Sequence, residues 1–96
     1  MADPLRVTAV KFAASSDADI ARGFLGRVRM VVNGLVVEGV TLRRTLDGRL
    51  SLAYPARRDA GGHRHFVVRP VDDQVRLVIE AQVFAALGIK AEELSS

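Results

Sequence analysis

The sequence predicts one small α+β domain over residues 1–96, an antiparallel sheet of four to five strands followed by a C-terminal helix. Three observations predict it. A chain of 96 residues is long enough for a single hydrophobic core. Short runs of β-branched residues are separated by the turn dipeptides Asn33-Gly34 and Asp47-Gly48. From Asp72 to Gly88 the pattern changes to a helical one. We expect residues 5–88 to form the ordered core and residues 89–96 a frayed tail.

Residues 23–44 carry the clearest local signal, two apolar runs around Asn33-Gly34. This dipeptide favours a two-residue hairpin turn, which would pair Val32 with Leu35 and Arg29 with Glu38. The predicted core face consists of Phe24, Val28, Met30, Val32, Leu35 and Val37. The opposite face carries Leu25, Val31, Val36, Val40 and Leu42 beside Arg27, Arg29 and Glu38. Because this second face is too apolar for solvent, we expect it to contact a partner, most simply another copy of the chain.

The remaining strands are shorter. Residues 5–13 form a candidate first strand, and residues 14–21, which are small and polar, a loop. A strand over residues 49–54 has Leu50, Leu52 and Tyr54 on its core face and ends at Pro55. Residues 56–64 form a basic loop. Residues 65–69 return as a short strand with Phe66 and Val68 on one face, and Pro70 ends it.

The C-terminal helix begins at Asp72 or Asp73, either of which can cap it, and ends before Gly88. Its predicted core stripe consists of Val75, Val78, Ile79 and Ala86, with Val83 at the margin. Leu77 and Phe84 fall outside the stripe. This leaves two interpretations: an imperfect stripe, or a helix that packs on its own sheet and also on a neighbouring chain.

The charge is concentrated in the middle of the chain. The net charge is only +3, but residues 22–70 hold ten arginines against Glu38, Asp47 and Asp59. The absence of cysteine excludes disulfides and thiolate metal sites, and fits a reducing compartment. The N-terminus lacks the pattern of a secretory signal, and no apolar run is as long as a membrane span, so we expect a soluble, cytoplasmic protein.

Arginines supply the candidate site. Arg57, Arg58 and Arg64, on the basic loop, are placed to bind phosphates, although a merely solvated loop would have the same composition. The arginines at predicted strand ends, Arg43, Arg44 and Arg69, complete the candidate nucleic-acid-binding set. Protection of a sheet edge explains Arg43 and Arg44 equally well.

Other chemistries have less support. His63 and His65 with Asp59 lack a third firmly placed ligand, so no metal is predicted. Tyr54 and Phe66 lie on the apolar side of their strands, which favours core packing over stacking on bases. The sequence contains no recognisable catalytic triad and no phosphate-binding glycine loop. We therefore predict a protein that is not an enzyme, with no cofactor and no small-molecule substrate.

The order of several motifs resembles one family. These are residues 7–11 (VTAVK), the Asn33-Gly34 hairpin, residues 48–55 (GRLSLAYP), the pair Arg57-Arg58, and Arg69-Pro70 before a helix. The chain is similar over nearly its whole length to the SpoVG family of bacterial septation and sporulation regulators. Arg57 and Arg58 match the family's basic pair and Gly62 its loop glycine. Arg69 stands where the family has histidine, and residues 63–65 make this loop more basic than usual.

The resemblance implies a small dimeric protein that binds DNA or RNA and acts as a regulator of cell division (septation) or of sporulation-type gene expression. It transfers the nucleic-acid role only to Arg57 and Arg58, where the motif matches. The competing hypothesis is a homo-oligomeric protein-interaction module in cell division whose charge is incidental.

Overall fold

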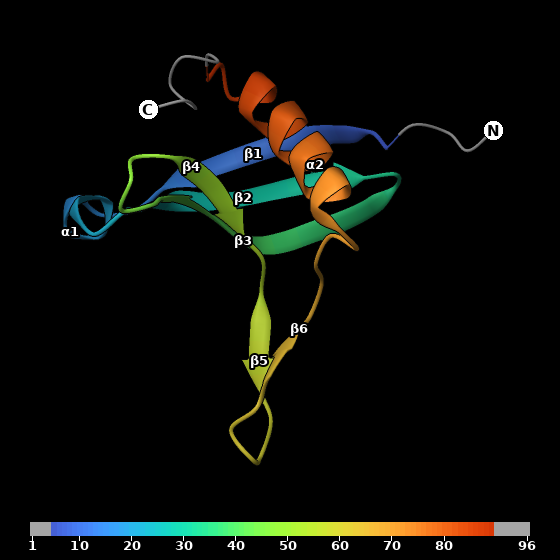
Figure 1. The fold of residues 1–96 in the computed structure, drawn as a ribbon. Coiled ribbons are helices and arrows are strands. Elements are labelled where there is room, and N and C mark those ends of the chain that lie inside the picture. Colours follow the sequence, from blue (N-terminus) through green and yellow to red (C-terminus); the bar gives the residue numbers. More distant parts are fainter. Residues whose placement is uncertain (1–4, 90–96) are drawn as a thin grey trace.

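Four strands form one antiparallel sheet in the order β1-β2-β3-β4, and a C-terminal helix crosses one face of it (Figure 1). The structure is a computed structural model, and it describes residues 5–89. The sheet consists of β1 (Val7–Ala14), β2 (Phe24–Val32), β3 (Leu35–Arg44) and β4 (Leu50–Ala53). Two further strands, β5 (Ala56–Arg58) and β6 (Arg64–Phe66), pair only with each other. The helices are α1 (Asp17–Ala21) and α2 (Asp73–Ala86). The predicted fold class is confirmed.

The β2–β3 hairpin turns at Asn33-Gly34, as predicted. Both residues have positive φ angles, 48° and 84°, which a type I′ turn requires. The expected register holds beside the turn, where Val32 lies opposite Leu35. The predicted contact between Arg29 and Glu38 is an ion pair of 2.9 Å. Beyond it the register shifts by one residue, because Gly39, with a φ of 81°, forms a β-bulge.

This bulge changes which side chains of β3 reach the core. After it, Val40 and Leu42 face the core and are 0% and 4% exposed, so the prediction that both lie on the opposite face was wrong. A second irregularity follows Phe24. Leu25 packs against the core there, whereas Phe24 is 39% exposed and does not belong to the core face. Leu35, beside the turn, is also exposed, contrary to the prediction. Val28, Met30, Val32 and Val37 take the core positions predicted for them.

Helix α2 covers the core face of the sheet. Asp72 caps it by accepting a hydrogen bond from the amide of Val75, and Gly88 follows its end with a φ of 75°, as predicted. Its buried residues are Ile79, Glu80, Val83 and Phe84. The apolar stripe is therefore turned toward Phe84, and the predicted core positions Val78 and Ala86 are exposed. The sheet contributes Val28, Met30, Val40, Leu42 and Leu52 to this core.

Two polar side chains of α2 bind backbone groups of the outer strands. The Gln82 amide accepts from the Val7 amide at 2.7 Å and donates to the Leu5 carbonyl at 2.8 Å. The Glu80 carboxylate accepts from the buried Leu52 amide at 3.2 Å and pairs with Arg76 at 3.1 Å. One helix thus fixes β1 and β4, the two edges of the sheet, which are the strands most exposed to non-native pairing.

Four predicted segments differ from the structure. Residues 14–21 contain a short helix, α1, capped by Ser16, instead of only a loop. The predicted basic loop begins with strand β5, and the predicted strand over residues 65–69 is β6, which ends at Phe66. Ile89 packs against the core and donates to the Phe84 carbonyl, so it is not frayed. The rest of the predicted tail, residues 90–96, lies outside the described residues. Among residues 5–89, no helix has the length and apolar character that crossing a membrane requires.

Candidate nucleic-acid interface

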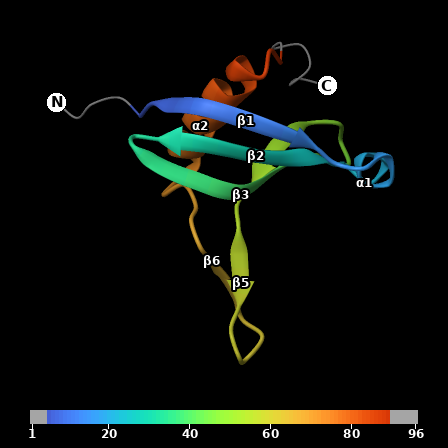
Figure 2. The same cartoon turned by 180° about the vertical axis from the view of Figure 1, so that it is seen from behind.

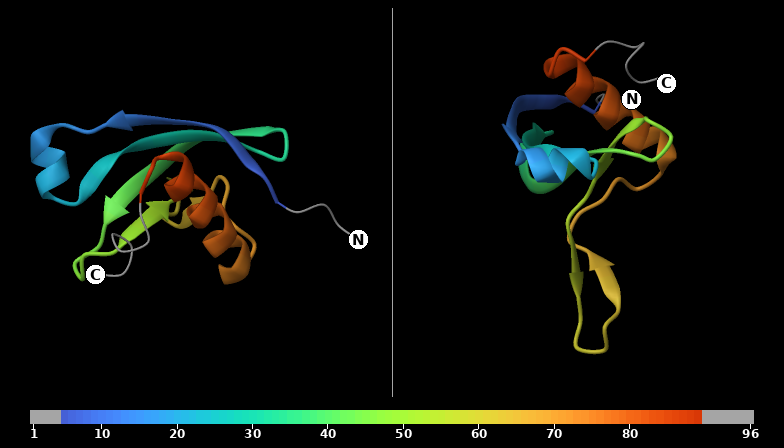
Figure 3. Two further views of the ribbon diagram at one scale, coloured as in Figure 1. Left: turned by 90° about the horizontal axis from the view of Figure 1, so that it is seen from above. Right: turned by 90° about the vertical axis from the view of Figure 1, so that its left-hand side faces the viewer.

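Strands β5 and β6 form an arm that extends away from the sheet and α2. The arm, residues 55–67, is an antiparallel ribbon that pairs Ala56 with Phe66, Arg57 with His65 and Arg58 with Arg64. A further hydrogen bond, from the Val67 amide to the Pro55 carbonyl, closes its base at 2.9 Å. Figures 1 and 3 show it pointing away from the body in perpendicular views. Apart from Pro55 and Ala56 at its base, all of its residues are exposed, which makes it accessible from both sides.

Asp59 organises the turn at the arm's tip. Its Oδ1 accepts from the amides of Gly61 and His63, both at 2.9 Å, and its Oδ2 lies 2.8 Å from Nε2 of His65. The hydrogen bond with His65, aided by the His63 and Gly61 amides, holds the pKa of Asp59 below its usual value. The carboxylate that partly offsets the arm's positive charge is thus engaged in holding the turn.

The arginines of the arm lie on both faces of the ribbon. Neighbouring residues of a strand point to opposite sides, so Arg57 and Arg58 cannot act as one clamp. One face holds Arg58, Arg64 and Phe66, and the other holds Arg57 and His65. The arginines predicted for the loop therefore lie on a thin ribbon that is basic on both faces.

Phe66 is part of this surface and not of the core. It is 49% exposed, with the guanidinium carbon of Arg64 at 5.1 Å and that of Arg69 at 6.0 Å from its ring centre. The prediction that Phe66 packs in the core was wrong because β6 leaves the body of the protein. For Tyr54 the prediction holds, since it packs against the core. Four predicted residues, Arg57, Arg58, Arg64 and Arg69, thus belong to the arm or its base.

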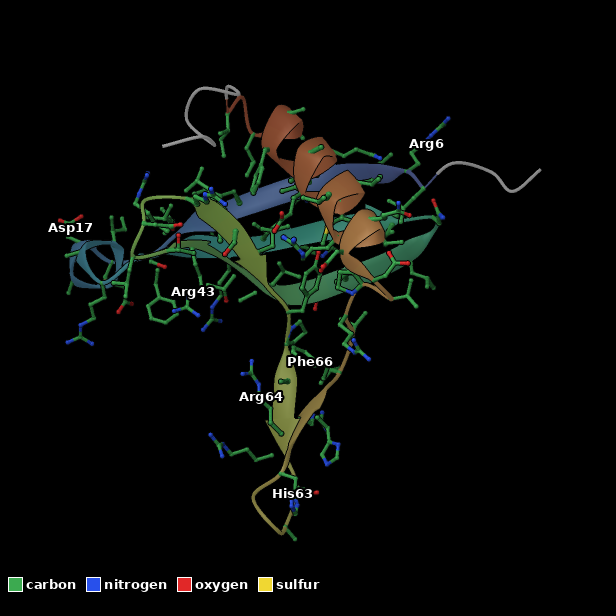
Figure 4. The ribbon with its side chains drawn as sticks, viewed as in Figure 1. Arg6, Asp17, Arg43, His63, Arg64 and Phe66 are labelled. Carbon is green, nitrogen blue, oxygen red and sulfur yellow. The ribbon has the colours of Figure 1, made fainter. Side chains whose placement is uncertain are left out.

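Arg43 and Arg44 do not join them. They end β3 on the body, and Figure 4 shows Arg43 well away from Arg64. The guanidinium carbon of Arg43 lies 4.7 Å from the ring centre of Phe24. Arg44 donates to the carbonyl of Gly48 at 3.3 Å. The candidate set is therefore divided between two separate surfaces.

The sequence placed Arg27, Arg29 and Glu38 on the second of these surfaces, but predicted it to be mainly apolar and did not group Lys11 or Arg43 with them. The face of β1, β2 and β3 opposite α2, which is turned toward the viewer in Figure 2, is here called the open face. The strand pairing places Lys11, Arg27 and Arg29 on it in addition to Arg43. With Val40 and Leu42 in the core, it is much less apolar than expected. Of the five apolar residues predicted for it, only Val31 and Val36 remain. The original reason for expecting a partner on this face was therefore wrong. Gly39 was the sequence feature that could have predicted the bulge, because glycine within a strand often marks one.

An apolar groove of about 380 Å³ lies elsewhere, between α2, the β2–β3 turn and the segment that follows the arm. Its lining includes Leu35, Tyr54, Val68 and Val71. Leu35 and Val71 are 71% and 78% exposed. Burial raises the pKa of Tyr54 to about 12, and repulsion from the Glu80 carboxylate adds to this shift. Exposed apolar side chains around a groove are typical of a protein-binding surface.

Within residues 5–89, no three His, Cys, Asp or Glu side chains are arranged to hold a metal ion. Comparison of the chain with protein-family models, with curated proteins and with solved structures found no match. The class defined by fold and site is a small α+β domain with a basic β-ribbon arm. The resemblance to the SpoVG family stays a prediction.

Proposed function

We propose that this protein is a non-enzymatic nucleic-acid-binding regulator that contacts its target through the arm. The observation that carries the proposal is a projecting two-stranded ribbon with arginine on both faces. Its only carboxylate is held in the turn by His65 and by backbone amides. Guanidinium groups bind phosphate in a bidentate manner, and a solvated loop would not need a paired ribbon to present them.

The dimensions of a β-ribbon suit duplex DNA. The major groove admits a two-stranded ribbon, so the arm can enter it with its arginines near the phosphates that border the groove. In this arrangement Arg58 and Arg64 serve one side and Arg57 the other. Such contacts to phosphate supply affinity that depends on salt and little on sequence.

The test is fluorescence anisotropy with labelled duplex DNA and RNA at several salt concentrations, for wild type and Arg58→Ala/Arg64→Ala. Each lost phosphate contact reduces the slope of log K against log salt by about 0.9 on duplex DNA, so we expect a reduction of about 1.8. The charge-matched control is Arg6→Ala/Arg49→Ala, because both side chains are exposed and lie off the arm. A folded arm variant that binds like this control contradicts the assignment.

We further propose that the protein forms a homodimer, as the resemblance to SpoVG regulators implies. In this proposal it acts in the cytoplasm on septation or sporulation-type gene expression. Exposed Leu35, Val68 and Val71 around the apolar groove support an interface there. Sedimentation tests it: Leu35→Ser/Val71→Ser should shift a dimer toward monomer. A wild type that is monomeric at micromolar concentration contradicts the dimer.

The same groove favours a second candidate function, a protein-interaction module without nucleic-acid binding. Absence of binding to DNA or RNA at low salt, together with a dimer that the groove variant disrupts, would favour this candidate over the first.

A further inference from the structure

The open face has an excess of positive charge that the arm does not explain. On β1, β2 and β3 it presents Lys11, Arg27, Arg29 and Arg43 against a single carboxylate, Glu38. That carboxylate pairs with Arg29 at 2.9 Å. The other three cations have no ion pair within the described residues. Three unneutralised cations on one face favour a polyanionic ligand.

The cations surround a hollow. Lys11 lies opposite Arg29 across the β1–β2 pairing, and Arg27 is two residues from Arg29 on the same face. Between them, above Ala13 and the bulge at Gly39, is a depression of about 240 Å³. This depression is open to solvent and is large enough to admit a phosphate group. Its lining includes the small residues Ala13 and Gly39 and the side chain of Glu38.

An aromatic side chain lies on the same face. Phe24 faces away from the core, and the guanidinium of Arg43 covers one side of its ring. Binding sites for single strands combine a basic track for the backbone with aromatic or arginine planes on which bases stack. A duplex keeps its bases stacked internally, so an exposed Phe–Arg pair on a sheet fits a single strand better.

We propose that the open face is a second nucleic-acid contact, which binds a single strand. Lys11 and Arg27 bind its phosphates, and one base stacks on Phe24 and Arg43. The inference deepens the proposed function by adding a site and a ligand class distinct from those of the arm. Figure 2 shows that no helix crosses this face of β1, β2 and β3.

The test uses a labelled oligo-dT of about twelve nucleotides, and the matching duplex, with four variants. They are Lys11→Ala/Arg27→Ala for the face, Phe24→Leu, the arm variant and the Arg6→Ala/Arg49→Ala control. On the single strand we expect the face variant to lower the salt slope by about 1.4, since each phosphate contributes about 0.7. Phe24→Leu should weaken single-strand binding at least about fivefold and leave duplex binding unchanged. Unchanged circular dichroism and melting confirm the fold of each variant.

The outcomes separate this inference from the proposed function. A face variant that binds the single strand like the control overturns the inference, and a weakened arm variant in the same experiment leaves the proposed function standing. If the face variant binds more weakly and the arm variant binds like wild type, the result supports the inference and contradicts the proposal that the arm binds nucleic acid. Wild type that binds no nucleic acid at about 50 mM salt overturns both. If Phe24→Leu lowers the affinity for the single strand and for the duplex equally, the proposed stacking of a base on Phe24 is contradicted.

Discussion

Replacing Glu80 with alanine tests how α2 is held on the sheet. Glu80 is 6% exposed, and its carboxylate is the acceptor for the buried amide of Leu52. Without it that amide has no partner, which costs about 1–3 kcal/mol. Arg76 also loses its buried partner, but its own side chain is 40% exposed and can be rehydrated. We therefore expect the variant to lose about 2–3 kcal/mol of unfolding free energy, or roughly 10–20 °C in Tm.

The assay is urea unfolding followed by circular dichroism. Glu80→Gln keeps an acceptor for the Leu52 amide and loses the charge, so it should cost about 1 kcal/mol. Asp73→Ala is the control, because Asp73 also pairs with Arg76, at 3.4 Å, but its side chain is 91% exposed. It should change stability by less than about 0.5 kcal/mol. If Glu80→Ala is as stable as this control, the reasoning about the buried amide is refuted.

Three further predictions concern the bulge, the groove and the arm. Gly39→Ala should lower the free energy of unfolding by about 1–2 kcal/mol because Gly39 has a left-handed φ. The loss should exceed that of Gly34→Ala, since a Cβ at Gly39 would lie 3.3 Å from Pro55, whereas a Cβ at Gly34 would meet nothing within 4 Å. Equal losses in urea unfolding would argue against the contact with Pro55. The pKa of Tyr54 is 10.0 in the unfolded chain and about 12 in the folded protein. Folding stability should therefore be intact below pH 10 and fall as the pH rises toward 12. Phenolate absorbance that rises at pH 10 in the folded protein would contradict this prediction. The pKa of Asp59 lies below its ordinary value of 3.8, so the turn that it holds should persist above pH 3.8 and loosen as the pH falls through the lowered pKa of the folded protein. NMR shifts of the arm amides that titrate at pH 3.8 would disprove this prediction.

Much of the fold follows from local signals in the sequence. Asn33-Gly34 determined the turn and the register beside it, and Asp72 and Gly88 determined where α2 begins and ends. These signals are sufficient because turn and cap preferences depend on a few adjacent residues. The bulge at Gly39 was not predicted, since a strand pattern read at a strict period of two assigns Val40 and Leu42 to the wrong face.

The candidate site was predicted less completely. The basic residues of the arm were identified from composition, but their separation onto two faces required the pairing of β5 with β6. Phe66 was assigned to the core because the alternation of apolar and polar residues shows which face of a strand is apolar. It does not show whether that strand packs on the body of the protein. The open face depends on irregularities in the pairing of β1, β2 and β3, so Lys11, Phe24 and Arg43 could not be grouped with Arg27 and Arg29 from the sequence.

The central claim is that the arm contacts nucleic acid, and an NMR titration of the labelled protein with a short DNA duplex tests it most directly. We predict that the backbone amides of residues 57–65 and the guanidinium signals of Arg57, Arg58 and Arg64 shift together, and that the shifts diminish as salt is added. Shifts confined to the apolar groove around Leu35 and Val71, with the arm unaffected, would contradict the claim.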